Sequence, residues 1–113
     1  MNFFRIPGQQ DTKARLIRSV SEKRVSHAQL FSGPEGCGSL ALALAYARYV
    51  SCENPDEQDS CGTCKSCVKH EKMIHPDVHF VFPVVRGKKD MEPVSDSFIG
   101  EWRVFVTLSL IHI

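Results

Sequence analysis

The eight residues 33–40, Gly-Pro-Glu-Gly-Cys-Gly-Ser-Leu, decide how the fold of this chain is interpreted. Gly33 and Gly38 are separated by four residues, which is the spacing of a phosphate-binding loop between a strand and a helix. In such a loop, lysine and then serine or threonine follow the second glycine, but here those positions hold Ser39 and Leu40. The segment therefore predicts a phosphate loop without its cation and without its magnesium ligand.

The glycines of a phosphate loop let backbone N–H groups point at phosphate oxygens, whereas phosphoryl transfer also needs the lysine charge and the bound magnesium. We therefore expect a degenerate, inactive cofactor-binding loop made of Gly33, Gly36, Gly38 and Ser39, and we do not expect ATP to bind. Residual backbone N–H groups can still hold a phosphate weakly. A tight strand-to-helix turn without a ligand is the alternative that these residues leave open.

The segments around the loop predict a βαβ unit. Residues 28–32 and 78–82 are short apolar runs, each followed by glycine or proline, as is typical of buried strands. Residues 40–47, between them, consist mainly of leucine and alanine, which are strong helix formers. Because parallel strands need a crossover connection, we expect an α/β fold with a partial P-loop-type parallel sheet. Helical spacing predicts further helices over residues 11–23 and around Phe98–Phe105.

Four cysteines, Cys52, Cys61, Cys64 and Cys67, follow the predicted crossover helix in a polar, turn-rich segment. The two-residue spacers of Cys61-x2-Cys64-x2-Cys67 let consecutive thiolates turn back toward one ion, and the loop from Cys52 closes the set. Four sulfur ligands are typical of structural zinc, because no coordination position remains open for water. We therefore expect a structural Zn²⁺ that supplies folding energy to a segment with little apolar core.

Other interpretations of the cysteine cluster stay open. A redox CxxC pair fits three cysteines in tandem poorly, and unligated buried thiols are a further alternative. His70 follows Cys67 closely and could replace Cys52 as the fourth ligand. Cys37, inside the glycine turn, is expected to pack there as a small apolar side chain.

The chain has 113 residues, of which 42% are hydrophobic and 24% charged, and its formal net charge is +1. These values fit one globular domain or a piece of one, and the small net charge does not select nucleic acid or a membrane surface. No apolar run approaches the roughly 20 residues of a membrane span, and residues 1–5 lack the pattern of a secretory signal. We therefore expect a cytoplasmic protein, where clustered cysteines favour metal binding over disulfides.

The last six residues, Leu-Ser-Leu-Ile-His-Ile at 108–113, are what a common transposon-end sequencing adapter encodes when it is translated. We therefore expect residues 108–113 to be a non-native tail and the natural protein to continue differently beyond residue 107. Residues 1–107 are then the N-terminal part of a nucleotide-binding-like domain, with the zinc module inserted at about residues 52–70.

The segment 24–38, Arg-Val-Ser-His-Ala-Gln-Leu-Phe-Ser-Gly-Pro-Glu-Gly-Cys-Gly, preceded by Pro-Gly-Gln at 7–9, resembles the N-terminal module of bacterial clamp-loader subunits of DNA polymerase III. These subunits belong to the AAA+ superfamily. The His-Ala-x-Leu-Phe-x-Gly-Pro-x-Gly-x-Gly string, the four-cysteine module and the following His-Pro-Asp at 75–77 carry the resemblance, which covers about residues 3–105. The sequence departs at Pro7, where this family commonly has an aliphatic residue.

Within that family, Ser39 and Leu40 are similar to the degenerate loop of delta-prime subunits. The resemblance implies a non-catalytic stator, a subunit of the polymerase III holoenzyme that sits with other clamp-loader subunits in a hetero-pentamer. That assembly loads the sliding clamp onto primed DNA, and delta-prime donates an arginine finger without hydrolysing ATP. The Walker B segment, arginine finger, lid and collar would follow these residues. An ATP-binding subunit of the gamma/tau type and an independent zinc-ribbon nucleic-acid-binding module are the alternatives.

Overall fold

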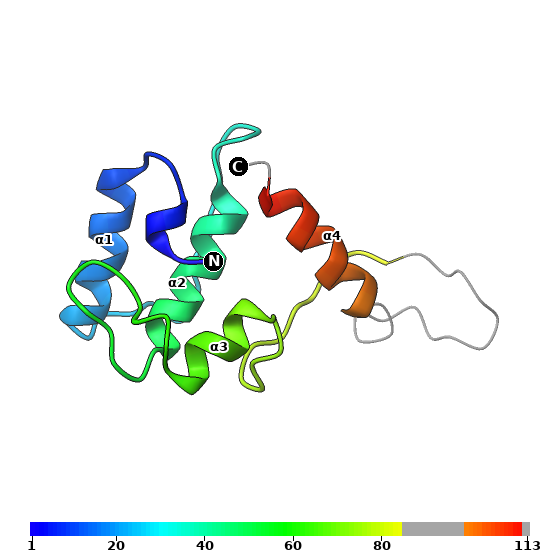
Figure 1. Ribbon diagram of the computed structural model, residues 1–113. Coiled ribbons are helices and arrows are strands. Elements are labelled where there is room, and N and C mark those ends of the chain that lie inside the picture. The colour runs from blue at the N-terminus through cyan, green and yellow to red at the C-terminus, as the bar shows by residue number, and fades with distance from the viewer. Residues whose placement is uncertain (85–98, 112–113) are drawn as a thin grey trace. The chain divides into compact units, whose positions relative to one another are not determined.

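The computed structural model describes residues 1–84 and 99–111, which belong to two compact units. The first unit comprises Met1–His75, and the second begins at Pro76. The described residues form one short 3-10 helix and four α-helices (Figure 1). In chain order these elements are η1 (Phe3–Arg5), α1 (Gln10–Ser21), α2 (Ser39–Ser51), α3 (Lys65–Glu71) and α4 (Ile99–Ile111).

Helix α2 is the centre of the first unit, where it packs against η1, α1 and α3 (Figure 1). The helix predicted over residues 40–47 is confirmed, and it extends to Ser51. Ala41 and Ala45 lie one turn apart and have no exposed surface, so neighbouring elements can approach α2 closely along this face. The small side chains that favour the helix therefore also allow it to be covered on several sides.

Helix α1 confirms the amphipathic helix predicted over residues 11–23, but it begins one residue earlier and ends two residues earlier. Two polar contacts fix it in the unit. The buried Lys13 ammonium donates a hydrogen bond to the Ile6 carbonyl, so a charge taken out of water keeps an acceptor. Ser19 and Tyr46 share a hydroxyl–hydroxyl hydrogen bond of 2.7 Å, which joins α1 to α2.

The N-terminal segment is fixed both to α2 and to the loop that follows α2. The Phe3 ring is buried, and its centroid lies 5.7 Å from that of Tyr49. The Asp59 carboxylate accepts hydrogen bonds from the backbone N–H groups of Phe3 at 3.2 Å and Phe4 at 3.0 Å. One carboxylate thus connects the start of the chain to the loop that carries the cysteines.

The predicted α/β fold is wrong, because the described residues form helices and irregular segments without any strand or parallel sheet. Residues 28–32, expected to be a buried strand, are irregular, and Leu30 is 91% exposed. Residues 78–82 are also irregular, and Val81 is 89% exposed. An apolar run becomes a strand only where a second strand pairs with its backbone, and that partner is distant in sequence. A local pattern cannot establish this non-local condition.

The second unit contains α4, which confirms the last predicted helix. Inside this unit the Trp102 ring stacks on Phe82, with a centroid distance of 4.5 Å and an interplanar angle of 11°. Phe80 and Phe105 also lie against Trp102, at centroid distances of 6.4 and 5.9 Å. The predicted start of this helix and residues 112–113 of the predicted tail lie outside the described residues.

Candidate metal centre

The four predicted metal ligands come from consecutive pieces of the first unit. Cys52 is the C-cap that directly follows α2, and Cys61 lies in the loop beyond it. Cys64 caps the N-terminus of α3, where its sulfur accepts a hydrogen bond from the backbone N–H of Cys67. Cys67 lies in the first turn of α3 and has no exposed surface. Two helix ends and one loop therefore supply the side chains of a single cluster.

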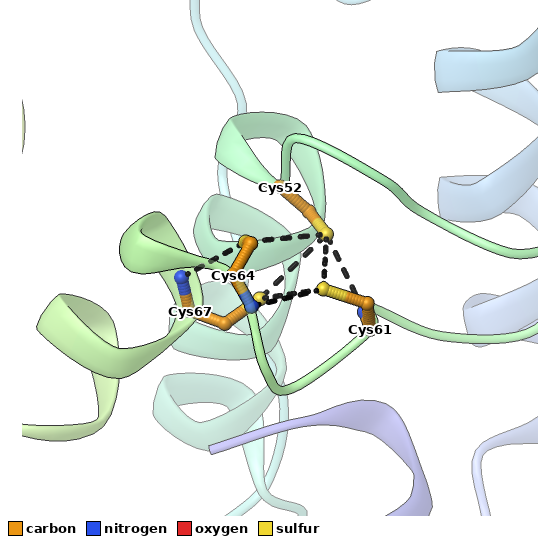
Figure 2. A group of neighbouring side chains, drawn as sticks. All are labelled: Cys52, Cys61, Cys64 and Cys67. Carbon is orange, nitrogen blue, oxygen red and sulfur yellow. Dashed lines mark hydrogen bonds between the residues drawn. The ribbon is translucent and has the colours of Figure 1, made fainter.

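Figure 2 shows the four side chains gathered with their sulfurs facing one another. From Cys52 Sγ, the distances are 3.5 Å to Cys61 Sγ, 3.6 Å to Cys67 Sγ and 4.0 Å to Cys64 Sγ. Cys61 Sγ and Cys67 Sγ are 3.9 Å apart, and all four sulfurs lie within 4.8 Å of one another. A tetrahedral ion bonded to four sulfurs at about 2.3 Å would separate them by about 3.8 Å. The cluster therefore has the size of a tetrahedral metal site.

Backbone N–H groups point at three of the sulfurs. Cys61 N–H donates to Cys52 Sγ at 3.3 Å, Cys64 N–H to Cys61 Sγ at 3.3 Å, and Cys67 N–H to Cys64 Sγ at 3.4 Å. The last two bonds join residues three apart, because each two-residue spacer turns the chain back onto the preceding sulfur. N–H donors stabilise thiolate over thiol, and thiolate is the form that binds a metal.

The sulfurs differ in how readily they lose a proton. The backbone N–H groups of Thr63 and Cys64 lower the pKa of the Cys61 thiol to about 6. Backbone N–H donors also lower the pKa of Cys64. Burial raises the pKa of the Cys52 thiol to about 12, although N–H donors act against it. The metal-free cluster therefore combines a readily ionised thiol, Cys61, with one that keeps its proton near neutral pH, Cys52, and metal binding must release a proton from Cys52.

His70 is not part of the cluster. Among the described residues, the four cysteines are the only group of histidine, cysteine or acidic side chains close enough together to hold a metal. The His70 ring instead lies 4.5 Å from the His75 ring, and burial lowers its pKa to about 4, with the His75 charge as the next cause. The geometry thus favours an all-cysteine set. All five cysteines are free, so the cluster is not a disulfide pair.

The loop between Cys52 and Cys61 has its own hydrogen bonds. The Asp56 carboxylate accepts from the N–H groups of Gln58 at 2.7 Å and Asp59 at 2.8 Å, and these donors lower the pKa of Asp56. The Tyr49 hydroxyl donates to the Asp56 carbonyl at 2.8 Å, which ties the loop to α2. The loop is therefore held in a defined turn on its way back to Cys61.

The glycine turn precedes α2 directly. Gly36 and Gly38 both have φ of +82°, a left-handed conformation that side chains disfavour, and Gly38 is the N-cap of α2. A Cβ at Gly33 would lie only 2.6 Å from the Cys37 sulfur, so a larger residue here would require the Cys37 side chain to move. Ser39 is the first residue of α2. The structure thus brings the four predicted loop residues together in one tight turn.

A hollow of about 600 Å³ lies beside this turn. Gly33 and Ser39 line it, and so do Arg15 of α1 and Arg24, which follows α1. Sequence analysis of residues 33–40 did not identify these two cations, because they come from another part of the chain. The turn itself contains no cation at the position where a phosphate loop has lysine.

Sequence analysis also missed a charged junction between η1, α2 and α3. Glu71 accepts hydrogen bonds from Arg48 Nη1 at 2.7 Å, from Arg5 Nη1 at 2.9 Å and from the Met1 ammonium at 3.1 Å. The Arg48 side chain is only 6% exposed. Its position in an apolar helix was a signal that could have revealed the junction, because a buried arginine requires an acidic partner.

The chain matches, over residues 8–106, the family described as DNA polymerase III, delta subunit. Because this match covers most of the sequence, the chain belongs to the DNA polymerase III delta-subunit family. The resemblance to clamp-loader subunits of DNA polymerase III is thereby confirmed. No solved structure matches the chain.

Individual relatives carry the names of two kinds of subunit. The delta-prime subunits of DNA polymerase III from Bacillus subtilis and Escherichia coli are 38% identical over 68 residues and 35% identical over 77 residues, covering 60% and 68% of this chain. The gamma/tau subunit of DNA polymerase III from Mycobacterium bovis is 39% identical over 67 residues, covering 59%. The chain spans 20% and 23% of the two delta-prime subunits and 12% of the gamma/tau subunit.

Family membership relates the chain to proteins that are named as subunits of DNA polymerase III. None of the described helices combines the length and the apolar character that crossing a membrane requires.

Proposed function

We propose that this chain is part of a delta-prime-type subunit that acts as a non-catalytic stator of the bacterial clamp loader. The single observation that carries the proposal is the turn at residues 33–40, which has the glycines of a phosphate loop but Ser39 and Leu40 in place of lysine and the hydroxyl residue. Without a cation and a magnesium ligand, the turn lacks the groups that stabilise phosphoryl transfer. The subunit would then contribute architecture to the assembly and leave ATP hydrolysis to its neighbours.

We further propose that Cys52, Cys61, Cys64 and Cys67 bind one structural Zn²⁺ within a module at about residues 52–70. Four sulfur–sulfur separations of 3.5–4.0 Å, with all sulfurs within 4.8 Å of one another, and the N–H groups directed at sulfur support this assignment. A four-thiolate set leaves no open position for water, so the ion would stabilise the loop and the start of α3 and would not act on a substrate.

The partners in this proposal are the other clamp-loader subunits in a hetero-pentamer, with the sliding clamp and primed DNA contacted through the complex. Family membership and the delta-prime relatives support this part. The cytoplasm is the corresponding compartment, because replication of bacterial DNA takes place there. Residues 1–107 would be the N-terminal part of the subunit's AAA+ region, with the zinc module inserted at about residues 52–70.

One competing function has an observation in its favour. The gamma/tau relative is about as similar as the delta-prime relatives, and Arg15 and Arg24 line the hollow beside the turn. If either arginine served as the missing cation, the chain could bind ATP as a gamma/tau-type subunit. Magnesium distinguishes the two functions, because neither arginine can replace the hydroxyl that Leu40 lacks.

The deciding experiment is a titration of the purified chain with ATP, with and without magnesium, followed by calorimetry and by an assay of released phosphate. We expect no magnesium-dependent binding below about 1 mM and no turnover, because nothing in the turn coordinates the ion. Sub-millimolar, magnesium-dependent affinity would overturn the stator assignment in favour of an ATP-binding subunit. Copurification with clamp-loader subunits would test the partners separately.

A further inference from the structure

A second hollow, of about 420 Å³, lies between η1, α2 and α3, on the side of the first unit that carries the metal cluster. We call it the Arg48 hollow. Gly62, from the loop between two of the cysteines, forms part of its wall. Its charged lining residues are Arg5, Arg48, Glu71 and Lys72. The space is enough for several water molecules, each of which occupies about 30 Å³ in the liquid.

The Arg48 hollow has an excess of positive charge. Three of its charged lining residues are cations and only one is an anion. The carboxylate of Glu71 is already shared, because Arg5 and Arg48 both donate to it, at 2.9 and 2.7 Å. Lys72 follows α3 directly and adds a third cation to the same wall. One carboxylate cannot neutralise three cations, so the hollow attracts an anion from solution.

The positive charge of Arg48 is poorly screened by water. Its side chain is 6% exposed, and among the described residues no acceptor lies within hydrogen-bond distance of Nε. A buried N–H of a guanidinium without an acceptor is unfavourable, because that group has lost its water without compensation. The electrostatic effect extends to His70, whose lowered pKa is due first to burial and then to the positive charges of His75 and Arg48.

We propose that the Arg48 hollow binds an oxyanion of the phosphate class. Arg5 and Lys72, which are more exposed, would contact the oxyanion directly, while buried Arg48 would contribute its charge from behind. The same chemistry has two possible sources, a free phosphate ion and a phosphodiester group of nucleic acid. This site is separate from the glycine turn and does not depend on the stator assignment.

The test titrates the full chain, loaded with zinc, with inorganic phosphate and, in a second arm, with a short oligonucleotide that has no terminal phosphate. Backbone amide NMR shifts locate the binding. Arg5→Gln and Lys72→Gln are the test variants, and Lys65→Gln, which makes the same charge change on exposed α3 outside the hollow, is the control. Each test variant should weaken binding about fivefold, and the control should not weaken it measurably.

The two titrations distinguish the two possible sources of the oxyanion. Binding of inorganic phosphate alone, sensitive to both test variants, assigns the site to a free phosphate-class ion, whereas equally sensitive oligonucleotide binding assigns it to a phosphodiester. Shifts at Gly62 and Lys72 are expected in either case. The proposal is overturned if neither probe binds, if both variants bind like the unsubstituted chain, or if only amides of the glycine turn at residues 33–40 respond.

Discussion

Arg48 of α2 donates a 2.7 Å hydrogen bond from Nη1 to Glu71 Oε2 of α3, and this ion pair joins the central helix to the helix that contains Cys67 and is capped by Cys64. The Arg48 side chain is 6% exposed, whereas that of Glu71 is 48% exposed. The pair is therefore asymmetric. Loss of the exposed partner leaves a buried charge, which costs more than loss of an ordinary surface ion pair.

Glu71→Gln should lower the free energy of unfolding by about 1–2 kcal/mol, because the buried guanidinium keeps only a neutral acceptor. Urea denaturation of the zinc-loaded chain measures this change. Glu57→Gln makes the same substitution at an exposed residue of the loop and should change stability by less than about 0.5 kcal/mol. Equal effects of the two substitutions would mean that the Arg48–Glu71 pair contributes no more than a surface charge.

The Arg48–Glu71 pair also predicts that the stability of the fold depends on pH. Burial raises the pKa of Glu71, but the Met1 ammonium, Arg48 and Arg5 together hold it below the ordinary value of 4.5. A depressed carboxyl pKa stabilises the fold above the unfolded-state pKa, and this stabilisation is lost as pH falls through the folded-state pKa. The stability difference between the unsubstituted chain and Glu71→Gln should thus be complete above about pH 5 and shrink toward about pH 3.

The unfolding free energies of the two proteins are compared at each pH because acid also protonates the cysteine sulfurs. That effect is the same in both proteins and cancels in the difference. A difference that stayed constant between these pH values would show that the charge of Glu71 is not the stabilising feature. Denaturation curves at matched ionic strength keep the screening of the pair unchanged.

Removal of the metal should destabilise the region around the cysteines without abolishing its fold. A chelator should release one zinc per chain and lower the urea concentration at which the chain unfolds, because the loop and the start of α3 have few apolar contacts to replace the ion. Cys64→Ser should weaken zinc binding at least about a hundredfold, more than is typical for a change outside the ligand set. Cys37→Ser is the matched control, since Cys37 lies outside the cluster and should leave affinity unchanged.

The features that sequence predicted correctly are local ones. The spacing of Cys61, Cys64 and Cys67 determines how the chain turns from one sulfur to the next, so the cluster can be inferred without knowledge of the rest of the fold. The leucine and alanine of residues 40–47 favour helix in any setting, and α2 contains them all. In both cases the local structure is determined by residues that are close together in sequence.

The features that sequence missed depend on distant partners. Residues 28–32 have a strand-like composition, but a strand also needs a neighbouring strand, and the described residues provide none. Arg48 and Glu71 are 23 positions apart, and Asp59 holds backbone groups 55 and 56 positions away. Such pairs form only when the other elements pack on α2. The spacing of residues within one segment does not reveal this packing.

Alkylation should reveal the unequal acidity of the thiols. The pKa of Cys61 is lowered to about 6 by backbone N–H donors, and that of Cys52 is raised to about 12, chiefly by burial. In metal-free protein near neutral pH, iodoacetamide should therefore modify Cys61 well before Cys52, as followed by peptide mass spectrometry. Zinc should protect both thiols, while labelling of Cys37 should be insensitive to zinc. Equal rates at Cys61 and Cys52 without metal would indicate that the cluster has lost its geometry.

Substitutions in the glycine turn can restore its two missing groups, the cation and the magnesium ligand, one at a time. Ser39→Lys restores a cation, but Leu40 still has no hydroxyl for magnesium, so we expect weak nucleotide binding that magnesium does not improve and no turnover. Adding Leu40→Ser to Ser39→Lys should make binding magnesium-dependent, because the double variant regains both groups. Calorimetric titration with ATP, with and without magnesium, measures these effects. ATP turnover by the Ser39→Lys variant alone would contradict the view that two losses, and not one, inactivate the turn.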